Sequence, residues 1–494
     1  MQQVTFQEYL NHRLSKNYQV ENPYDQLEYV LTASDSPSYQ ARVAGIRFKA
    51  SQHFFEAIED YRESLEVSGM QFNDLVLRGK PIVSAKQIAE RFYRKDTSLR
   101  FHNRLEKLKD WLLNKLKEAQ NVERHEPWVQ ERIELLSDEE YNKAHAYLAK
   151  KRGFKRESID DFEVDRKDLA KLIVQQRLKP LRKQVREFEF IDMKGIYKQL
   201  FADPLAIKRW MNGDTPEEWP AICEATLKML DEDRLGYEDA TPYLLLNELI
   251  KGFQANRTIK HIVVDEAQDY SPFQFEFLRR LFPAAKITVL GDFNQAIFAH
   301  ASETADFNML TNLFGSDEAE VIDMARSYRS TKPIIEFTRK LVPNGNQIIP
   351  FEREGDQPEL KQVKNHAELH RCIASKVADY QDAGYNTIAI ICKSAEESRN
   401  AFEALSAIDD IKLQRIGSME YEQGVVVVPS YLAKGIEFDA VIIFDASEHV
   451  YGDESLRRIF YTACTRAMHN LQLYSVGDPT PLLQTVPRDF YLLD

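Results

Sequence analysis

Acidic side chains follow an apolar run in the sequence HIVVDEAQDY, which covers residues 261–270. The run Ile262–Val264 predicts a buried strand, and Asp265 stands at its carboxyl end. Because Mg²⁺ prefers hard oxygen ligands, Asp265 is placed to supply one, directly or through water. Glu266 could position or deprotonate a water that attacks a phosphoryl group. An acidic surface turn explains the Asp–Glu pair alone, whereas the full ten-residue stretch favours a catalytic site.

A second apolar run, in ITVLGDFNQAIF over residues 287–298, predicts another buried strand with a polar end. Gly291 and Asp292 follow the strand, and Gln295 stands just beyond them. A side-chain amide at this position can donate a hydrogen bond to a phosphate oxygen. An ordinary strand–turn has the same pattern, so the stretch by itself is only moderately specific.

Two further stretches supply arginines. In ARSYRSTKPIIEF, Arg329 precedes a predicted helix and could bind a phosphate through two hydrogen bonds. In ESLRRIFYTACTRAMH, helical spacing places Arg458, Thr462, Thr465 and Arg466 on one face. Such a stripe suits an arginine finger that completes a phosphate site from a second domain. Solvent-exposed arginines are the alternative for each stretch alone.

A polar loop separates two apolar runs in VVVVPSYLAKGIEFDAVIIFD. The loop carries Lys434, Gly435 and Glu437. Glu437 could accept a hydrogen bond from a ribose hydroxyl, and an ordinary loop acid is the alternative. The spacing alone does not decide between them.

The elements that must position these residues change in character along the chain. Residues 46–250 are mostly helical in pattern, and the stretch 150–186 is basic. That stretch is either a solvated helical face or a contact for a phosphate backbone or an acidic protein surface. From residue 255 onward, helical patterns alternate with the β-branched runs HIVVD, ITVLGD, EVIDM, TIAIICKS, GVVVVPS and AVIIFDA. This alternation predicts parallel sheets covered by helices, with ligands at the strand ends.

The totals set limits on the class of protein. The chain has 494 residues, 43% hydrophobic and 29% charged, which is enough for two or more domains. Its net charge of -13 excludes a basic nucleic-acid coat over the whole chain but permits a local basic groove. The four cysteines lack metal-ligand spacing, and no apolar run approaches the roughly 20 residues of a membrane span. We therefore expect a cytoplasmic protein with reduced thiols and no membrane contact.

In their order, VDEAQD, GDFNQAIF, SYRS, KGIEFD and YTACTRA resemble motifs II to VI of superfamily 1 helicases of the UvrD/Rep type. This resemblance covers about half of the chain and implies an α/β fold with two RecA-like parallel sheets, of the P-loop NTPase type. It implies ATP and Mg²⁺ as cofactors, bound between the two RecA-like domains. It also implies that the first domain is incomplete and carries a large, mostly helical insertion.

The resemblance assigns roles to the motif residues. Asp265 would bind Mg²⁺, Glu266 would be the catalytic base, and Gln295 would sense the γ-phosphate. Arg329 and Arg466 would act as arginine fingers from opposite flanks. Nucleotide-binding positions would be Gly291, Asp292, Tyr328, Gly435 and Glu437. Contacts to nucleic acid or to a protein partner would be Phe298, Tyr431 and Lys434.

Departures from the motifs favour one branch of the family. FAHAS follows Ile297, and Pro429 and Tyr431 stand where unwinding members have residues that touch single-stranded DNA. With the short spacing between SYRS and KGIEFD, the chain looks most like HelD, a helicase IV-related ATPase that binds RNA polymerase and frees it from stalled complexes. The domains would be 1–45, a remnant of the first RecA-like domain, then 46–235, an arm-like insertion, 236–342, the rest of the first domain, and 343–494, the second domain.

A phosphate-binding loop of the form G-x-x-x-x-G-K-[ST] is absent from the sequence, since the one Gly-Lys pair, Gly79-Lys80, is followed by Pro81. We therefore expect weak ATP binding, and whether the chain is an enzyme stays open. The resemblance and the missing loop predict the C-terminal part of an ATP-dependent RNA polymerase recycling factor. The alternatives are a 3'-5' DNA helicase of the UvrD or helicase IV type, and a non-enzymatic RNA polymerase-binding protein.

Overall fold

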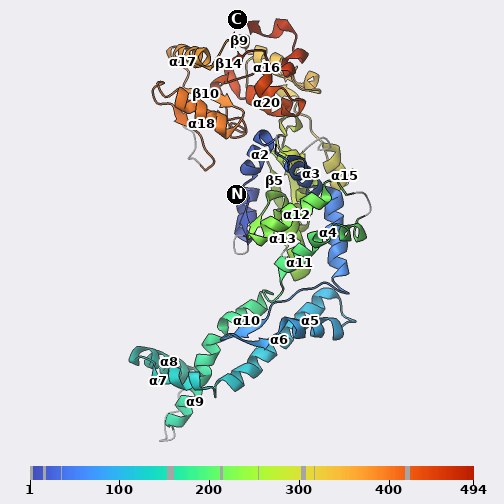
Figure 1. The fold of residues 1–494 in the computed structure, drawn as a ribbon, viewed down its shortest axis with the longest axis vertical. Coiled ribbons are helices and arrows are strands. Elements are labelled where there is room, and N and C mark those ends of the chain that lie inside the picture. The colour runs from blue at the N-terminus through green and yellow to red at the C-terminus, as the bar shows by residue number, and fades with distance from the viewer. Residues whose placement is uncertain are drawn as a thin grey trace.

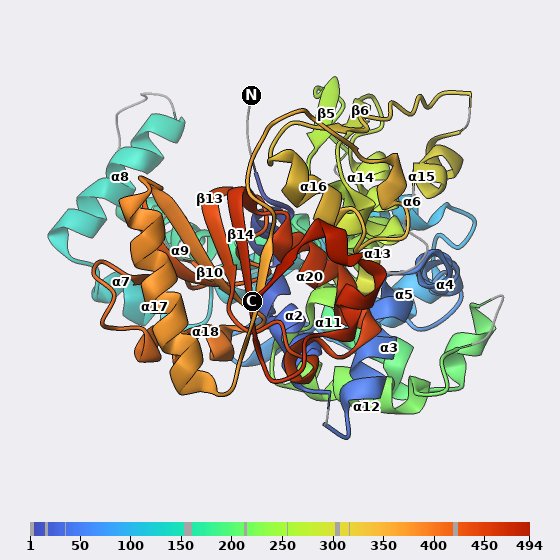
Figure 2. The ribbon, with the colours of Figure 1, turned by 90° about the horizontal axis from the view of Figure 1, so that it is seen from above.

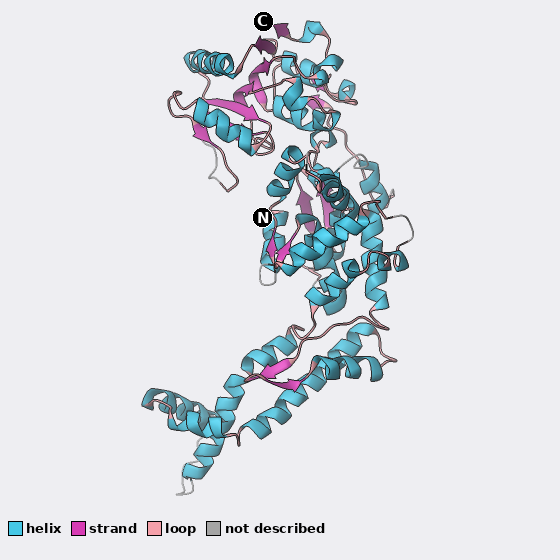
Figure 3. Cartoon of the chain, in the orientation of Figure 1, coloured by secondary structure: helices cyan, strands magenta, loops and turns pink. Residues whose placement is uncertain are grey.

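The computed structural model describes residues 4–14, 18–34, 36–152, 161–211, 215–253, 255–301, 307–315, 317–417 and 423–494. The chain forms three bodies along one long axis (Figure 1). We call them the arm (residues 65–192), the middle unit (residues 4–64 and 193–314) and the C-terminal unit (residues 326–494). Helices and strands are mixed (Figure 3). None of the helices in the ranges given above is long and apolar enough to cross a membrane.

A seven-stranded sheet, parallel throughout, forms the centre of the C-terminal unit. Ile390 lies between Val427 and Ile442 in register. Both faces of the sheet are covered, which explains why its central strands read as continuous β-branched runs. In spatial order the strands are β11 (Lys412–Leu413), β12 (Gly424–Pro429), β10 (Thr387–Cys392), β13 (Phe438–Ile443), β14 (Ala467–Val476), β9 (Glu359–Val363) and β15 (Leu492–Leu493).

Helices cover this sheet from two sides (Figure 2). On one face, α17 (His366–Asp382) and α18 (Ala395–Ala404) pack on a core that includes Ile390 and Ile442. The other face packs against a second core, which includes Ile391 and Val441. The helices of that side are α16 (Lys332–Thr338), α19 (Glu448–Tyr451) and α20 (Arg457–Cys464).

The helix α16 belongs by its packing to the C-terminal unit, because Ile334 and Phe337 are fully buried in its second core. The preceding turn is fixed there too, since the Ser330 hydroxyl donates to the carbonyl of Ala467 at 2.6 Å. Two short paired strands, β7 (Arg326–Ser327) and β8 (Ile349–Pro350), flank the helix. The predicted domain boundary between residues 342 and 343 is therefore too late in the chain.

A two-stranded parallel sheet in the middle unit carries the acidic motif. Its strands are β5 (His261–Val264) and β6 (Lys286–Val289), and only Val264 is buried. Val263 is 49% exposed and Leu290, just after β6, is 46% exposed. The prediction of two buried strands is thus wrong. The packed core beside them, built from α14 and α15, covers a single face, and in the described ranges no third strand joins the pair.

The predicted strand EVIDM, residues 320–324, is also not formed. Ile322 is 75% exposed and Met324 is 85% exposed. A β-branched run becomes a strand only where a neighbour pairs with it. Here the structure supplies no such neighbour within the described part of the chain.

Helices surround the small sheet and build most of the middle unit. They are α1 (Phe6–Leu14), α2 (Pro23–Thr32), α3 (Tyr39–Lys49), α4 (Gln52–Ser64), α11 (Met193–Ala202), α12 (Trp219–Asp231), α13 (Tyr237–Lys251), α14 (Pro272–Leu281) and α15 (Phe307–Phe314). Short strands β1 (Gln19–Val20) and β4 (Arg234–Leu235) pair in parallel beside them.

The arm projects from the middle unit (Figure 1). It contains an antiparallel hairpin and a set of helices, and it shares a continuous apolar core with the middle unit. Since α4, α11 and α12 pack in the middle unit, the projecting part is shorter than the predicted insertion of residues 46–235. The arm elements are β2 (Leu75–Leu77), β3 (Lys80–Val83), α5 (Ala85–Arg94), α6 (Phe101–Glu123), α7 (Pro127–Glu134), α8 (Asp138–Arg152), α9 (Asp161–Arg177) and α10 (Lys179–Arg186).

Candidate nucleotide site between the middle and C-terminal units

The turn after β5 presents the acidic motif to solvent. Asp265 is exposed, and its Oδ1 accepts a hydrogen bond from the backbone N–H of Glu266 at 2.9 Å. Glu266 has a φ of 50°, a left-handed conformation that is uncommon for residues other than glycine. The Glu266 side chain accepts from the Gln268 amide at 2.6 Å. The strand therefore ends in a tight turn that leaves the Asp265 carboxylate free for a ligand.

Helix α14 begins directly after this turn and holds it in place. Ser271 and Gln274 form a reciprocal capping box, and Pro272 occupies the first turn of the helix. Serine before a helix and proline in its first turn are favoured residue types at these positions, so the helix start agrees with the local sequence. The helix is anchored by its apolar face, where Phe273 and Phe277 are buried.

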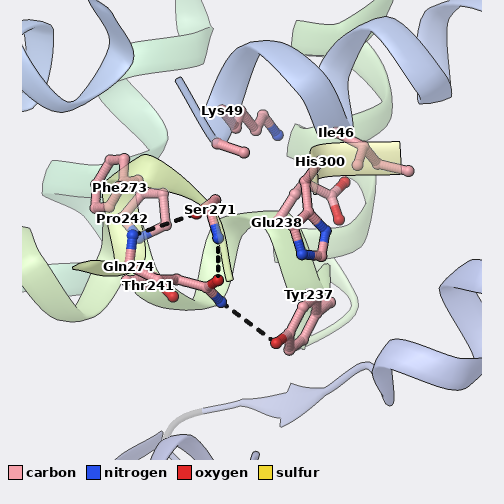
Figure 4. A pocket seen from close by; sticks show the side chains of 11 residues that line it. Ile46, Lys49, Tyr237, Glu238, Thr241, Pro242, Ser271, Phe273, Gln274 and His300 are labelled. Carbon is pink, nitrogen blue, oxygen red and sulfur yellow. Dashed lines mark hydrogen bonds between the residues drawn. The ribbon is translucent and has the colours of Figure 1, made fainter. Parts of the chain in front are cut away.

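A small polar cavity of about 20 Å³ lies behind the turn, between α3, α13 and α14 (Figure 4). Gln274 bonds to the Tyr237 hydroxyl at 3.3 Å across this cavity. His300 also lines it, and its Nε2 donates to the carbonyl of Asp269 at 2.8 Å. Burial lowers the pKa of His300 to about 4, so the ring is neutral at pH 7. No local pattern in the sequence predicts this support of the turn.

The turn after β6 lies against the first turn. The backbone N–H of Asp292 donates to the Gln268 side chain at 3.1 Å. A Cβ at Gly291 would stand 2.6 Å from the same oxygen, so this close approach requires glycine. The Gln295 amide nitrogen donates to Asp292 at 2.9 Å. The predicted residues of these two motifs are therefore brought together.

Arg466 reaches this cluster from the C-terminal unit. Its Nη2 donates to Gln295 Oε1 at 2.7 Å, and its Nε donates to the carbonyl of Thr462 at 3.1 Å. The residue is 1% exposed. Burial, together with the nearby charge of Arg329, lowers the pKa of Arg466 to about 10. Among the described residues no carboxylate forms an ion pair with this buried guanidinium, so it is placed to meet an anion.

Lys434 also crosses from the C-terminal unit to the acidic turn. Its Nζ lies 2.5 Å from Asp269 Oδ1 and 3.5 Å from Glu266 Oε2, and the side chain is 7% exposed. It also donates to the carbonyl of Gln295 at 3.1 Å. Burial raises the pKa of Asp269 to about 6 despite the attraction of Lys434. Lys434 was predicted as a nucleic-acid or partner contact, and here it neutralises the acids instead.

Arg329 and Glu437 form an ion pair at 2.5 Å. Both side chains belong to the C-terminal unit and are partly exposed, at 39% and 42%. Arg329 and Arg466 thus both belong to the C-terminal unit, and their action from opposite flanks of a nucleotide stays a prediction. Tyr328 is 60% exposed, with its ring 5.2 Å from that of Phe351.

Gly435 precedes Glu437 in the loop between β12 and β13. Its φ of 79° lies in the left-handed region, where a side chain would be strained, although the space around it is open. This glycine therefore serves the shape of the loop that carries Lys434 and Glu437.

Phe298 and Tyr431 are buried rather than available to a ligand. They are 9% and 1% exposed, and they share an apolar cluster with Leu27 of α2. The Tyr431 hydroxyl donates to Glu28 at 2.7 Å, and Tyr24 stacks on its ring at 5.8 Å. In this arrangement neither side chain contacts nucleic acid or a partner as predicted, because both join the middle and C-terminal units.

Glu28 is a second cross-unit contact that the sequence did not predict. Its carboxylate accepts from the backbone N–H of Ala395 at 3.0 Å, at the start of α18. A carboxylate at a helix N-terminus is stabilised by the helix dipole. The surrounding sequence YDQLEYVLT reads as an ordinary amphipathic helix, so only the tertiary structure identifies this role.

The donor set fits one kind of metal site. Mg²⁺ is usually held by one or two carboxylates together with waters and substrate phosphates. Asp265 offers one such carboxylate, and the described residues contain no group of three or more His, Cys, Asp or Glu that could hold a metal by themselves. The site therefore suits a magnesium ion that arrives with a nucleotide.

Two family models match the chain. The UvrD/REP helicase N-terminal domain matches residues 52–313, which is more than half of the chain. The UvrD-like helicase C-terminal domain matches residues 424–474, which include β12, β13 and α20. These matches define a protein with helicase superfamily 1 domains. More particularly, the chain belongs to the UvrD/REP helicase family.

Curated relatives show the same relationship. The ATP-dependent DNA helicase srs2 of Schizosaccharomyces pombe is 29% identical over 33% of this chain and 20% of its own length. The Escherichia coli ATP-dependent DNA helicase Rep is 28% identical over 32% of this chain and 25% of its own length. DNA helicase II of Escherichia coli is 27% identical over 29% of this chain and 21% of its own length. The chain thus spans a quarter or less of the length of each of these relatives.

One solved structure is similar in sequence to part of this chain. It is the C-terminal domain of a possible DNA helicase from Lactobacillus plantarum WCFS1, 38% identical, with a TM-score of 0.30. The match covers 34% of this chain and 98% of that one.

Proposed function

We propose that this chain is the nucleotide-responsive part of an ATP-dependent DNA helicase, with two RecA-like units and ATP·Mg²⁺ bound between them. The observation that carries the proposal is the convergence of Glu266 and Gln295 with Arg466 across the unit interface, where Arg466 lies 2.7 Å from Gln295. Hydrolysis of a phosphoanhydride needs a metal-binding carboxylate, a base and a cation for the developing charge. These three elements occur here at one place.

Each side chain has a role consistent with its position. Asp265 holds Mg²⁺, Glu266 activates the attacking water, and Gln295 links the γ-phosphate to Arg466. Arg329 exchanges its ion pair with Glu437 for a phosphate oxygen, which frees Glu437 for the ribose. The observed ion pair then describes a site that is closed without nucleotide, in which ATP replaces Glu437 as the partner of Arg329.

The nucleotide is expected to bind weakly. The sequence lacks the glycine-rich loop whose backbone N–H groups and lysine would hold the β- and γ-phosphates. Lys434 also occupies the space beside Glu266 and Asp269 with its own charge. We therefore expect this chain to turn over ATP more slowly than about 1 per second, the lower end of ordinary phosphoryl-transfer rates.

DNA is the preferred substrate because the named relatives are DNA helicases. These relatives do not support the first function predicted from the sequence, which is RNA polymerase recycling. It stays as a second candidate on one observation: Phe298 and Tyr431, at positions expected to touch single-stranded DNA, are buried between the units. Retention of purified RNA polymerase without any nucleotide, together with no binding of DNA, would favour that candidate.

The test measures Mg²⁺-dependent binding of a fluorescent ATP analogue, and ATP turnover with and without single-stranded DNA. Asp265→Asn should weaken nucleotide binding at least fivefold, and Glu266→Gln should abolish the residual turnover without loss of binding. Glu320→Gln, an exposed acid remote from the site, serves as the matched control. Turnover faster than about 1 per second would disprove the weak-binding hypothesis. Turnover that survives Glu266→Gln would reject the assigned site.

A further inference from the structure

A groove in the arm lies between the α7–α8 pair and the α9–α10 pair, with a volume of about 1140 Å³. The helices α7, α8 and α9 lie at the far end of the arm and α10 lies nearer the middle unit, and all four are away from β5 and β6 (Figure 1). The helicase motifs do not include this groove, and the nucleotide site does not use it. Part of the basic stretch of residues 150–186 forms one wall, although residues 153–160 lie outside the described residues.

The lining is strongly basic in a chain whose net charge is -13. It contains two acids, Glu131 and Glu140. Seven lining residues are cationic: Arg78, Arg132, Lys143, Arg177, Lys179, Arg182 and Arg186. This excess of positive charge is therefore local, and its sign is opposite to that of the net charge of the whole chain.

The cations of the α9–α10 wall are not neutralised by the protein. Among the described residues, Arg177, Lys179, Arg182 and Arg186 form no ion pair, whereas Arg132 and Lys143 on the other wall pair with acids at 2.8 Å and 2.5 Å. Arg182 donates to the side chain of Gln120 at 2.7 Å, which is a neutral acceptor. Burial and the like charge of Arg186 lower the pKa of Arg182. An anion that approaches such a cluster stabilises its positive charges.

The opposite wall offers flat and apolar side chains. Trp128 is half-buried, with Arg78 over its ring at 4.8 Å. Tyr147 is 49% exposed and Leu135 is 74% exposed. Single-stranded nucleic acids are bound by grooves that combine cations for the backbone with aromatic rings for the bases. This groove has cations along one side and aromatic rings along the other. Paired bases in a duplex do not expose their faces to such rings.

The geometry points to a single-stranded nucleic-acid site in this groove, separate from the nucleotide site and independent of ATP. Phosphates contact Arg177, Lys179, Arg182 and Arg186, and an unpaired base stacks on Tyr147, beside the ring of Trp128 that Arg78 covers. The groove holds a short stretch of strand of about four nucleotides, which is the lower end of the site sizes known for single-strand binding. The proposal does not require that ATP is hydrolysed. It can therefore be tested independently of the proposed function.

The test measures fluorescence anisotropy of a labelled 12-nucleotide oligo(dT) with the full chain, without nucleotide, over a range of salt concentrations. Arg182→Glu combined with Arg186→Glu should weaken binding at least tenfold and reduce the salt slope by about 1. Lys183→Glu with Arg186 intact is the matched control, because Lys183 lies on α10, is absent from the lining and faces Glu187 at 3.8 Å. It should change the affinity less than threefold.

A second variant tests the stacking wall. Tyr147→Ala should weaken binding about fivefold or more with an unchanged salt slope, since stacking on one base is worth about 1–3 kcal/mol. If the double charge reversal does not fold, judged by circular dichroism, Arg177→Glu with Lys179→Glu replaces it, because both of these side chains are exposed. Oligo(rU) in place of oligo(dT) distinguishes RNA from DNA as the strand, and tight binding of either supports the site.

Three results would overturn the proposal. The first is an equal loss of oligo(dT) affinity in Lys183→Glu and in the double reversal. The second is an equal affinity for a duplex of the same length. The third is displacement of oligo(dT) by polyglutamate at equal charge concentration, together with no effect of Tyr147→Ala. The last result would assign the groove to an acidic protein. Glu266→Gln should leave oligo(dT) binding unchanged, which separates this site from the nucleotide site.

Discussion

The seven-stranded sheet of the C-terminal unit and the β5–β6 pair of the middle unit differ in what happens to nearly identical local sequences. HIVVDEA and AVIIFDAS each place an aspartate just after a β-branched run. After β13, Asp445 is 5% exposed, accepts hydrogen bonds from the N–H groups of Ser447 and Val476, and has a pKa raised by burial. After β5, Asp265 is exposed. One aspartate is part of the fold, and the other is free to bind a ligand, because only one of the sheets is covered on both faces.

The difference between the sheets should be largest in their local stability. Amide hydrogens of β10 and β13 should exchange at least about a thousandfold more slowly than those of β5 and β6, an opening free energy larger by about 4 kcal/mol. The reason is that β10 and β13 have neighbours on both edges and helices on both faces, whereas β5 and β6 form a two-stranded sheet. Hydrogen exchange followed by mass spectrometry measures this. Equal protection in the two sheets would contradict the comparison.

Substitution of one isoleucine in a covered strand and one in the unpaired run EVIDM should give the next largest difference. Ile442→Ala, in the fully buried centre of β13, should lower the free energy of unfolding by about 2–5 kcal/mol. Ile322→Ala, at a side chain that is 75% exposed, should change it by less than about 0.5 kcal/mol. Urea denaturation of both variants measures the two values. A large loss for Ile322→Ala would show that residues 320–324 are packed in solution.

The pH dependence of the C-terminal unit should give the smallest effect. Burial raises the pKa of Glu397 from 4.5 to about 7. Since the folded state then binds the proton more tightly than the unfolded state, the free energy of unfolding falls as the pH rises from about 4.5 to about 7. Glu397→Gln cannot ionise, so it should be more stable than the parent by about 1–3 kcal/mol at pH 8 and equal to it at pH 4.5.

Thermal denaturation at these two pH values measures the effect of Glu397→Gln. Glu396→Gln is the control, because Glu396 is the exposed neighbour on the same turn of α18. Its stability should match that of the parent at both values. Loss of stability in Glu397→Gln at pH 8 would mean that the hydrogen bond from Lys393 to the carboxylate outweighs the burial of its charge.

The sequence predicted the candidate site better than the packing around it. The helix start at Ser271, the strands of the C-terminal unit and the group of motif residues follow from local patterns of residue type. The burial of β5 and β6, the unit to which Arg329 belongs and the contacts of Lys434 do not. Those features depend on which segments lie opposite one another, and a run such as EVIDM carries no information about whether a partner strand is present.

The sequence by itself determined the family, the order of the motifs and the residues proposed to carry phosphate chemistry, because those depend on residue type and spacing. Only the tertiary structure decided which charges face one another. It paired Lys434 with Asp269, turned Arg466 toward Gln295 and buried Tyr431 against Glu28. It also brought four unpaired cations and two aromatic rings to one groove of the arm. Charge and stacking act over a few ångströms, so distance in space, and not distance along the chain, sets their effect.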